Sequence, residues 1–361
     1  MSGDAGVMTD DPTRPVDLRQ HAEEIAQAGA RAPSHHNAQP WAFRVLPGAV
    51  EVHADRSRRL PVADPEDRQL FLGVGAAVYG VRLALAVLGL RPVVRLARDD
   101  ARPDLAATVM ASGQADPARP AEWAHSADPA ADSAADSAEA RRHRELGHRQ
   151  TVRGPFTDEP LPSSLQAELA SEVDEEGAAL YWAVAEESRR GLAALIAAAD
   201  REQRADLDLR AELVRSVGPA AVRRRAGIPL DSLGRAAAPT GTEVGFAMRD
   251  FSAGDPDLGA PTHRAEADPG IAVLHTKTDE RPDWLRGGQA MHRLLLAASA
   301  AGYQASFLNQ PLEVPRLRDE LRRALALSGH PQVVLRLGRP RDPLPPPTPR
   351  LPVSDVLTIG G

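Results

Sequence analysis

Apolar residues recur at helical spacing in several long segments, and short β-branched or aromatic runs lie between them. Near the start, Leu18, Ala22 and Ile25 share one face of a predicted helix, which ends before Pro33 because proline disfavours helical geometry in the residue before it. The pattern predicts helices at 16–31, 67–88, 139–147, 162–174, 187–215, 283–301 and 313–326, and strands at 41–46, 50–53, 93–97, 105–110, 271–275, 304–308 and 333–337. The stretch 218–269 shows neither period. Helices alternating with few strands predict an α+β fold.

The length of the chain predicts two halves. At 361 residues it exceeds the size at which a single hydrophobic core usually stops growing. A low-complexity run of Ala, Asp, Ser and Pro predicts a connector between the halves. We expect a flexible tail at 1–15, a first half at 16–125, a linker at 126–138 and a second half at 139–361 that ends in an arm at 340–361.

Two of the predicted helices resemble each other. Residues 75–89 align without gaps on residues 288–302, and both segments begin and end with glycine. Both are apolar almost all round, as expected for helices buried at the centre of a molecule or against each other. The alignment favours an internal repeat, and the alternative is a chance likeness between two alanine-rich core helices.

Composition excludes several kinds of chemistry. Cysteine is absent, which removes disulfides, thiolate metal sites and Cys nucleophiles, so redox chemistry requires a bound cofactor. Of the 43 basic residues only Lys277 is lysine, so phosphate contacts fall to arginine. The net charge of −7 gives no reason to expect a nucleic-acid or membrane partner. We find no apolar run of membrane-spanning length and no signal-peptide pattern, and we expect a cytoplasmic protein.

A loop after the first predicted helix carries a specific motif. Residues 33–41 read Pro-Ser-His-His-Asn-Ala-Gln-Pro-Trp. This run resembles the Pro-Ser-x-x-Asn-x-Gln-Pro-Trp signature of the nitroreductase superfamily, in which the loop reaches across a dimer interface to the FMN of the other subunit. The alternative is a polar turn leading into a strand. The resemblance implies FMN contacts from Pro33, Ser34, His35 and Asn37, whose hydroxyl and amide groups can bond the ribityl chain and the pyrimidine edge.

The second half begins with a complementary motif. Residues 148–153, His-Arg-Gln-Thr-Val-Arg, resemble the family's Arg-Arg-Ser-x-Arg run, which the first half lacks. The second half in turn lacks the Pro-Ser-x-x-Asn signature. This pattern resembles the Acg-type branch of fused nitroreductases, and it implies a nitroreductase-like fold of two diverged halves that form a pseudo-dimer within a monomer. The implied roles place Arg149 and Thr151 on the phosphate and ribityl chain with Gln150 beside them. Arg153, where many relatives have lysine, then lies near the flavin N1/O2 edge, where a cation stabilises the reduced anion.

Two later segments complete the implied flavin site. Residues 304–311 resemble the family strand whose backbone N–H groups point at flavin N5, which implies Phe307, Asn309 and Gln310; the alternative is a core strand that ends in a polar turn. Near the C-terminus, Arg350 resembles the basic residue that closes on the phosphate. The proline-rich run around it is otherwise typical of a PPII ligand for a partner domain.

Two further signals are assigned no chemistry. Gly73-Val-Gly75 lies inside a helical pattern with no strand ahead, so it indicates close helix packing rather than a dinucleotide site. His35 and His36 have no carboxylate partner in the sequence around them, and we expect no metal site there.

The resemblance implies an FMN-dependent oxidoreductase. NADH or NADPH would reduce the flavin at N5, and a small electron-poor acceptor such as a nitroaromatic or a quinone would then be reduced. No side chain is assigned as a catalytic acid or base. The alternative is an FMN-binding store or sensor with little turnover, in which residues 218–269 form a lid over the flavin that excludes nicotinamide.

Overall fold

The computed structural model describes residues 16–97, 101–114, 137–233, 246, 248–249, 251 and 269–361. The predicted tail at 1–15, most of the predicted linker and much of the predicted lid lie outside the described residues. The described part mixes helices with two sheets, which confirms the α+β class.

The described strands form two sheets. The first contains β1 (Trp41–Val45), β2 (Ala49–Ala54), β3 (Leu90–Leu96), β4 (Leu105–Gln114) and β9 (Leu357–Ile359), in the order β3-β4-β2-β1-β9. The second contains β5 (Ala179–Trp182), β6 (Gly270–Thr276), β7 (Gln304–Phe307) and β8 (His330–Gly338), in the order β5-β6-β8-β7. Neighbouring strands are antiparallel, except that β9 runs parallel to β1.

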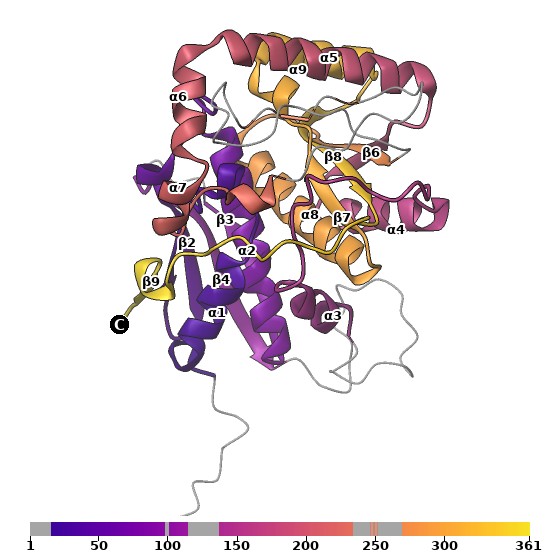
Figure 1. The fold of residues 1–361 in the computed structure, drawn as a ribbon. Helices are drawn as coiled ribbons and strands as arrows, with labels where there is room; N and C mark the ends of the chain where they lie inside the picture. Colours follow the sequence, from indigo (N-terminus) through magenta and orange to yellow (C-terminus); the bar gives the residue numbers. More distant parts are fainter. Residues whose placement is uncertain are drawn as a thin grey trace, which may run out of the picture.

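The two sheets repeat one topology. The first sheet contains the strand order β1-β2-β4-β3, and the second sheet has the order β5-β6-β8-β7. These strands of the two sheets therefore correspond one to one along the chain. Each half also inserts one long helix between its second and third strands, α2 (Arg68–Val87) in the first and α8 (Arg281–Ala300) in the second. The two helices lie side by side at the centre of the molecule (Figure 1). The same order of strands and one long helix thus occurs twice along the described chain, whereas the domain bounds expected from the sequence stay a prediction.

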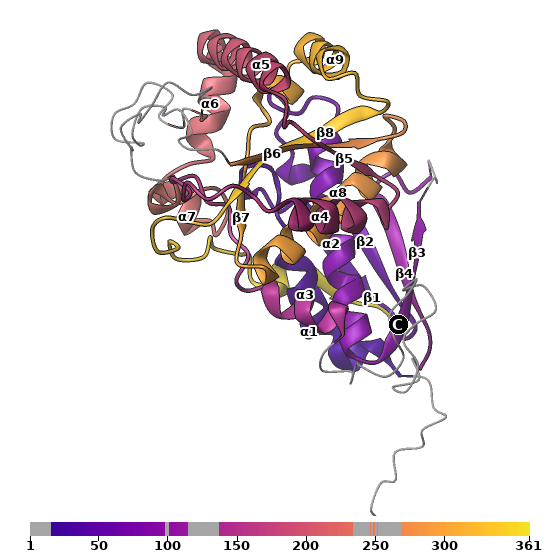
Figure 2. The same cartoon turned by 90° about the vertical axis from the view of Figure 1, so that its right-hand side faces the viewer.

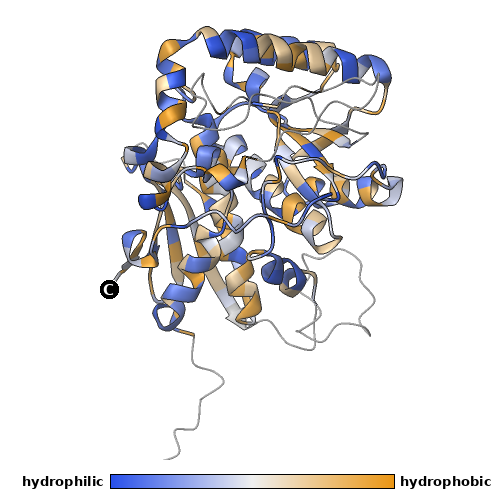
Figure 3. Cartoon of the chain, in the orientation of Figure 1, coloured by the Kyte–Doolittle hydropathy of each residue, from blue (hydrophilic) through white to orange (hydrophobic). Residues whose placement is uncertain are grey.

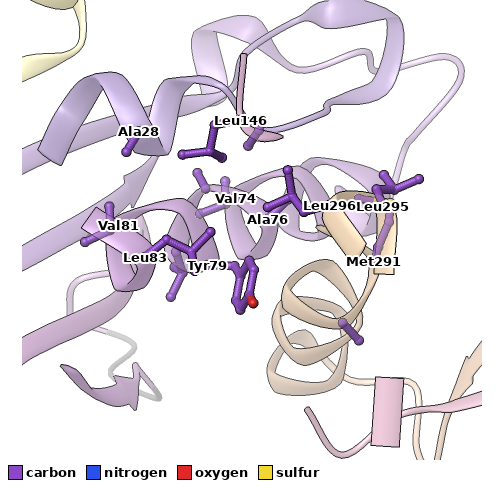
Figure 4. Packing of buried hydrophobic residues seen from close by; sticks show 14 of the residues in the cluster. Ala28, Val74, Ala76, Tyr79, Val81, Leu83, Leu146, Met291, Leu295 and Leu296 are labelled. Carbon is purple, nitrogen blue, oxygen red and sulfur yellow. The ribbon is translucent and has the colours of Figure 1, made fainter. Parts of the chain in front are cut away.

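Reciprocal glycine contacts join α2 to α8. A Cβ atom built on Gly75 would overlap the backbone of Leu285, and one built on Gly288 would overlap the backbone of Leu72. Leu72 stands three residues before Gly75 in α2, and Leu285 stands three residues before Gly288 in α8. The contact between a glycine and a leucine backbone therefore occurs twice, with the two helices exchanged. Such a reciprocal contact is what a two-fold relation between two copies produces. Around it, side chains of both helices interdigitate (Figure 4).

Further helices pack around the two sheets and the central pair of helices. In the described residues these are α1 (Ala22–Ala30), α3 (Ala138–Glu145), α4 (Ser163–Asp174), α5 (Glu186–Ala205), α6 (Leu207–Arg215), α7 (Pro219–Arg223) and α9 (Pro315–Ala324), with short 3-10 turns η1 (Leu18–His21), η2 (His35–Asn37), η3 (Arg56–Arg58), η4 (Leu230–Ser232), η6 (Gln310–Glu313) and η7 (Val353–Asp355). Helices α5 and α9 lie together over the second sheet (Figure 2) and enclose a separate apolar cluster with it. Hydrophilic residues colour α3 almost throughout, whereas the strands are largely hydrophobic (Figure 3).

One connection differs greatly between the halves. The first sheet joins β1 to β2 through a tight turn, whereas the second joins β5 to β6 through residues 183–269, which include α5, α6 and α7. We call residues 183–269 the insertion. The predicted lid at 218–269 is its second part.

The structure corrects several sequence expectations. The helix predicted at 187–215 is two helices, because Asp206 leaves the helical conformation and its carboxylate caps α6 by accepting from two backbone N–H groups. Strand β5 and helix α7 lie where no element was predicted. The proline-rich arm of the second half ends in β9, which joins the sheet of the first half (Figure 1). That pairing depends on a distant strand and leaves no local pattern.

Helix α2 is the one described helix that is long and apolar enough to cross a membrane by length and composition. Arg82 interrupts its apolar run, so this helix does not contradict the expectation that the chain has no uninterrupted apolar run of that length. Of its most apolar stretch, 83% is buried inside the fold. That burial is expected of a helix that packs against α8 and the first sheet.

We predict that Gly288→Ala lowers the free energy of unfolding by about 1–3 kcal/mol or more, because its methyl group forces α2 and α8 apart. The matched control is Gly191→Ala in α5, where a Cβ meets no atom within 4 Å. The control should gain about 0.5–1 kcal/mol from helix propensity. Urea unfolding measures both, and equal stability of the Gly288 variant and the wild type would contradict the close approach.

Candidate functional site

A cavity lies where the two halves meet. Eleven of the twelve predicted site residues line it: Pro33, Ser34, His35, Asn37, Arg149, Gln150, Thr151, Arg153, Phe307, Asn309 and Arg350. Gln310 is the exception, because it is fully buried and is not among the lining residues. Residues far apart in the sequence therefore meet in one place.

The loop at 33–37 has a strained backbone. His36, Asn37 and Gln39 all adopt positive φ, a region that side-chain-bearing residues visit rarely. Hydrogen bonds hold the loop in this form: the Gln39 N–H donates to Ser34 Oγ at 2.9 Å, and Asn37 Nδ2 donates to the Gly227 carbonyl at 2.9 Å. Ser34 itself rests on Gly73, which confirms that this glycine serves close packing.

The arm and the insertion are bonded to this loop. Asn37 Nδ2 donates to the Pro349 carbonyl at 3.0 Å, and Asn37 Oδ1 accepts from Arg350 at 3.0 Å. Gln39 donates to the Arg225 carbonyl at 2.8 Å and accepts from the Leu351 N–H at 2.9 Å. Asn37 and Gln39 thus join three segments of the chain, a role that the motif alone did not indicate. The expected contact of Asn37 with a flavin stays a prediction.

The segment 149–153 runs along β7. The Val152 N–H donates to the Ala305 carbonyl at 2.9 Å, and the Gln150 N–H donates to Gln304 Oε1 at 2.9 Å. Buried Arg336 of β8 holds the end of the segment by donating to the Gly154 carbonyl at 2.7 Å. The segment is therefore held by its backbone, which leaves the side chains of Arg149 and Arg153 at the cavity.

Three arginines of the cavity, Arg149 buried and Arg153 and Arg350 half-buried, have no carboxylate partner among the described residues. Arg149 makes no side-chain hydrogen bond there, Arg153 donates to the Ser232 carbonyl at 3.1 Å and lies over the Phe251 ring, and Arg350 donates to the Ala30 carbonyl at 2.9 Å. Burial lowers the pKa of Arg149 and of Arg153 to about 10, and burial with the charge of Arg149 lowers that of Arg350 to about 9. All three remain charged at neutral pH, so the cavity suits an anion.

Two histidines and a carboxylate also line the cavity. His36 is buried, and its ring nitrogens find no hydrogen-bond partner among the described residues. Burial, together with the neighbouring His35, keeps the pKa of His36 well below its ordinary value. His35 Nε2 lies 3.3 Å from Glu313 Oε1. Within the part of the chain that the structure describes, no three His, Asp or Glu side chains gather closely enough to hold a metal ion.

Sequence reasoning missed Glu313 and Arg249. Arg249 Nη2 donates to both oxygens of Glu313, at 2.6 and 2.7 Å, and Gln203 donates to one of them at 2.8 Å. Burial raises the pKa of Glu313, but Arg249 and His35 outweigh it and hold that pKa far below its ordinary value. Gln203 and Arg249 belong to the insertion, and Glu313 belongs to η6. No local sequence pattern links these three residues.

A second cavity lies at the place equivalent to the first. Arg286 stands where Gly73 stands in the other half, and the loop residue Gly177 lies against it as Ser34 lies against Gly73. Here Arg82 and Arg293 are paired with carboxylates: Arg82 donates to Glu176 at 2.6 Å, and Arg293 contacts both Glu176 and Glu172. The three arginines of the first cavity lack the carboxylate partners that Arg82 and Arg293 have in the second.

Fold and site together define an α+β protein whose two sheets share one strand order, with the predicted motifs gathered at an arginine-lined cavity. No protein-family model matches the chain. The Mycobacterium tuberculosis protein "Putative NAD(P)H nitroreductase Rv3131" is 30% identical over 339 residues, which cover 92% of this chain and 90% of the relative. The "Putative NAD(P)H nitroreductase acg" of the same organism is 28% identical over 346 residues, covering 93% and 95%. The chain belongs to this NAD(P)H nitroreductase family, which confirms the resemblance.

Solved structures give more distant likenesses. A nitroreductase with bound FMN from Desulfitobacterium hafniense has a TM-score of 0.35 at 13% identity and covers 60% of this chain and 97% of its own. A protein titled a putative nitroreductase, from Anabaena variabilis, has a TM-score of 0.42 at 12% identity and covers 89% of this chain and 73% of its own.

The cavity's charge gives a pH prediction. Burial and the charge of Arg149 lower the pKa of His292, a core residue that donates to the Ala76 carbonyl, to about 3. The unfolded chain binds this proton near pH 6.5, so His292 costs about 1.4 kcal/mol of stability per pH unit as pH falls from 6.5 towards 3.

Between pH 7 and pH 5, the free energy of unfolding of His292→Gln should therefore fall by about 2 kcal/mol less than that of the wild type. Urea unfolding at both pH values measures the difference, and comparing slopes removes any effect on packing. Parallel slopes would show that His292 titrates normally in the fold.

Proposed function

We propose that the protein binds FMN in the arginine-lined cavity and acts as an NAD(P)H-dependent oxidoreductase. It would reduce an electron-poor acceptor such as a nitroaromatic or a quinone. The observation that carries this proposal is the meeting of the loop at 33–37 with the segment 149–153, each present in only one half. The family's name for its members, NAD(P)H nitroreductases, supports the electron donor.

The lining fits the proposed cofactor. A flavin mononucleotide joins a dianionic phosphate to a large planar ring, and it therefore needs cations together with apolar surface. Arg149 has a buried Nε without a partner among the described residues, which suits the phosphate. Leu72, Met291 and Phe307 offer apolar surface from α2, α8 and β7. When bound, the flavin would supply the hydride chemistry, and the protein would orient it and place positive charge near its ring.

We further propose one FMN per chain, in a cytoplasmic monomer that acts as a pseudo-dimer. The second cavity lacks both motifs, and its Arg82 and Arg293 are already paired with Glu172 and Glu176. A phosphate placed there would have to displace these carboxylates and would meet their repulsion. The asymmetry of charge supports the single site.

A specific observation favours the alternative function of FMN storage or sensing. Several described residues of the insertion, Ile228, Ser232, Met248, Arg249 and Phe251, line the cavity. A cover formed by them would leave a nicotinamide little access to the flavin face. The insertion is also bonded to the loop at 33–37 through the Gly227 carbonyl.

We predict that Arg149→Gln weakens FMN binding about 10- to 100-fold, because one charge-assisted hydrogen bond contributes about 1.5–3 kcal/mol. Arg91→Gln is the matched control, since Arg91 is an exposed arginine at the second cavity. Fluorescence titration of the FMN-free protein measures affinity and stoichiometry. Unchanged affinity in the Arg149 variant, or two FMN per wild-type chain, would contradict the composite site.

Anaerobic mixing with NADH or NADPH separates the two functions. If the protein is an oxidoreductase, the flavin absorbance near 450 nm bleaches within seconds, whereas a store bleaches only with dithionite. Stopped-flow absorbance measures the rate. A protein that takes up no FMN at all would contradict both functions.

A further inference from the structure

We propose that His35 donates the proton that the acceptor takes up together with its hydride, and that Glu313 is the residue that positions His35 for this step. The inference rests on the proposed function, and it assigns a side chain to a step for which the sequence indicated none. His35 is the catalytic residue of the pair, because it lines the cavity in which the acceptor would bind.

The contact between His35 and Glu313 has the form of a catalytic pair. His35 Nε2 lies 3.3 Å from Glu313 Oε1 in an ion-pair contact, and neither ring nitrogen of His35 makes a hydrogen bond among the described residues. A carboxylate beside one ring nitrogen fixes which nitrogen carries the proton, orients the ring and stabilises its charged form. The distance is that of an ion pair and is longer than a short hydrogen bond. Catalytic contacts are often loose before the substrate binds.

The surroundings of Glu313 keep it fixed and charged. Its side chain is 2% exposed, and Arg249 and Gln203 hold its oxygens. A buried carboxylate with one arginine, one amide and one histidine has partners on both oxygens, and it would be costly to bury without them. The geometry therefore delivers one fixed negative charge to one side of the His35 ring.

His36 lacks these features although it lies next to His35 and lines the same cavity. Its ring lies 4.0 Å from that of His35 between centroids, and its nitrogens have no hydrogen-bond partner among the described residues. In the described part of the chain, His35 contacts His36 and Glu313, and Arg249 pairs with Glu313. Of these groups Glu313 is the negative one.

The step is balanced in atoms and electrons. A quinone gains a hydride, which brings both electrons from NAD(P)H by way of the cofactor, and one proton. The His35 N–H bond breaks as an O–H bond forms on the acceptor, which leaves as the hydroquinone. Water then returns a proton to the neutral imidazole. A nitro group undergoing its first two-electron reduction uses the same hydride and proton and releases water.

The kinetic test separates the two half-reactions. FMN-loaded protein is reduced with one equivalent of dithionite and mixed anaerobically with benzoquinone, and flavin absorbance reports the reoxidation. We expect His35→Gln to slow reoxidation about 100-fold or more, the scale of general acid catalysis, and to remove its pH dependence. His21→Gln, a histidine outside the cavity that pairs with Glu24, should match the wild type. Wild-type rates and an unchanged pH profile in His35→Gln would overturn the proposal.

Glu313→Gln tests the positioning role by a readout that lost packing alone would not move. Without the carboxylate to orient the ring, the rate of reoxidation should fall about 10-fold or more, whereas the reduction of the flavin by dithionite stays complete. The ring 15N signals of His35, assigned by their loss in His35→Gln, should change at fixed pH in the FMN-free protein, because Nε2 loses its negatively charged neighbour. Unchanged signals would overturn the role of Glu313. If this variant does not fold, His35→Gln decides the proposal alone.

The outcomes distinguish this proposal from the proposed function. Dithionite reduction needs no nicotinamide, so a protein that NADH and NADPH fail to reduce still shows whether His35 controls reoxidation. A protein that binds no FMN refutes the oxidoreductase and with it the role of His35 in acceptor reduction. In that case the ring 15N signals still show whether Glu313 acts on His35.

Discussion

The close contact between α2 and α8 is the constraint on which the site depends. Gly75 and Gly288 let the backbones of the two helices touch, and each helix carries its own sheet behind it. Because the lining of the cavity comes from both helices, through Leu72 and Met291, the spacing of the helices sets the width of the cavity. Packed interiors do not deform continuously. A change at the glycines would therefore be felt at the site.

The same geometry occurs twice and has two different chemical outcomes. In one cavity the loop at 33–37 rests on Gly73, and the cavity's arginines include three without carboxylates among the described residues. In the other, Arg286 replaces the glycine, and glutamates neutralise Arg82 and Arg293. Fold equivalence thus does not bring equivalent chemistry, because function lies in the side chains placed on the fold.

Sequence reasoning recovered what has a local signal. The long apolar period marked α2 and α8, and the two motifs together with the two later segments marked eleven residues of one cavity. It failed where only the folded chain brings partners together. Strand β9 is three residues long and gains its pairing from β1, more than 300 residues earlier. In the sequence, Glu313 looks like an ordinary residue at the start of a helix. Its role at the site depends on its contacts with Arg249 and His35, which lie far from it in the sequence.

The site carries costs that the fold alone does not need. Three features of the site lower the stability of the fold. They are positive φ at His36, Asn37 and Gln39, cavity arginines without carboxylate partners among the described residues, and a buried His36 without hydrogen-bond partners there. Each of these costs about 1–3 kcal/mol in an otherwise marginally stable protein. An anionic ligand would repay part of this by pairing the arginines, and a ligand that binds only the folded state stabilises it by mass action. The strain and the uncompensated charge are therefore best understood as parts of a binding site.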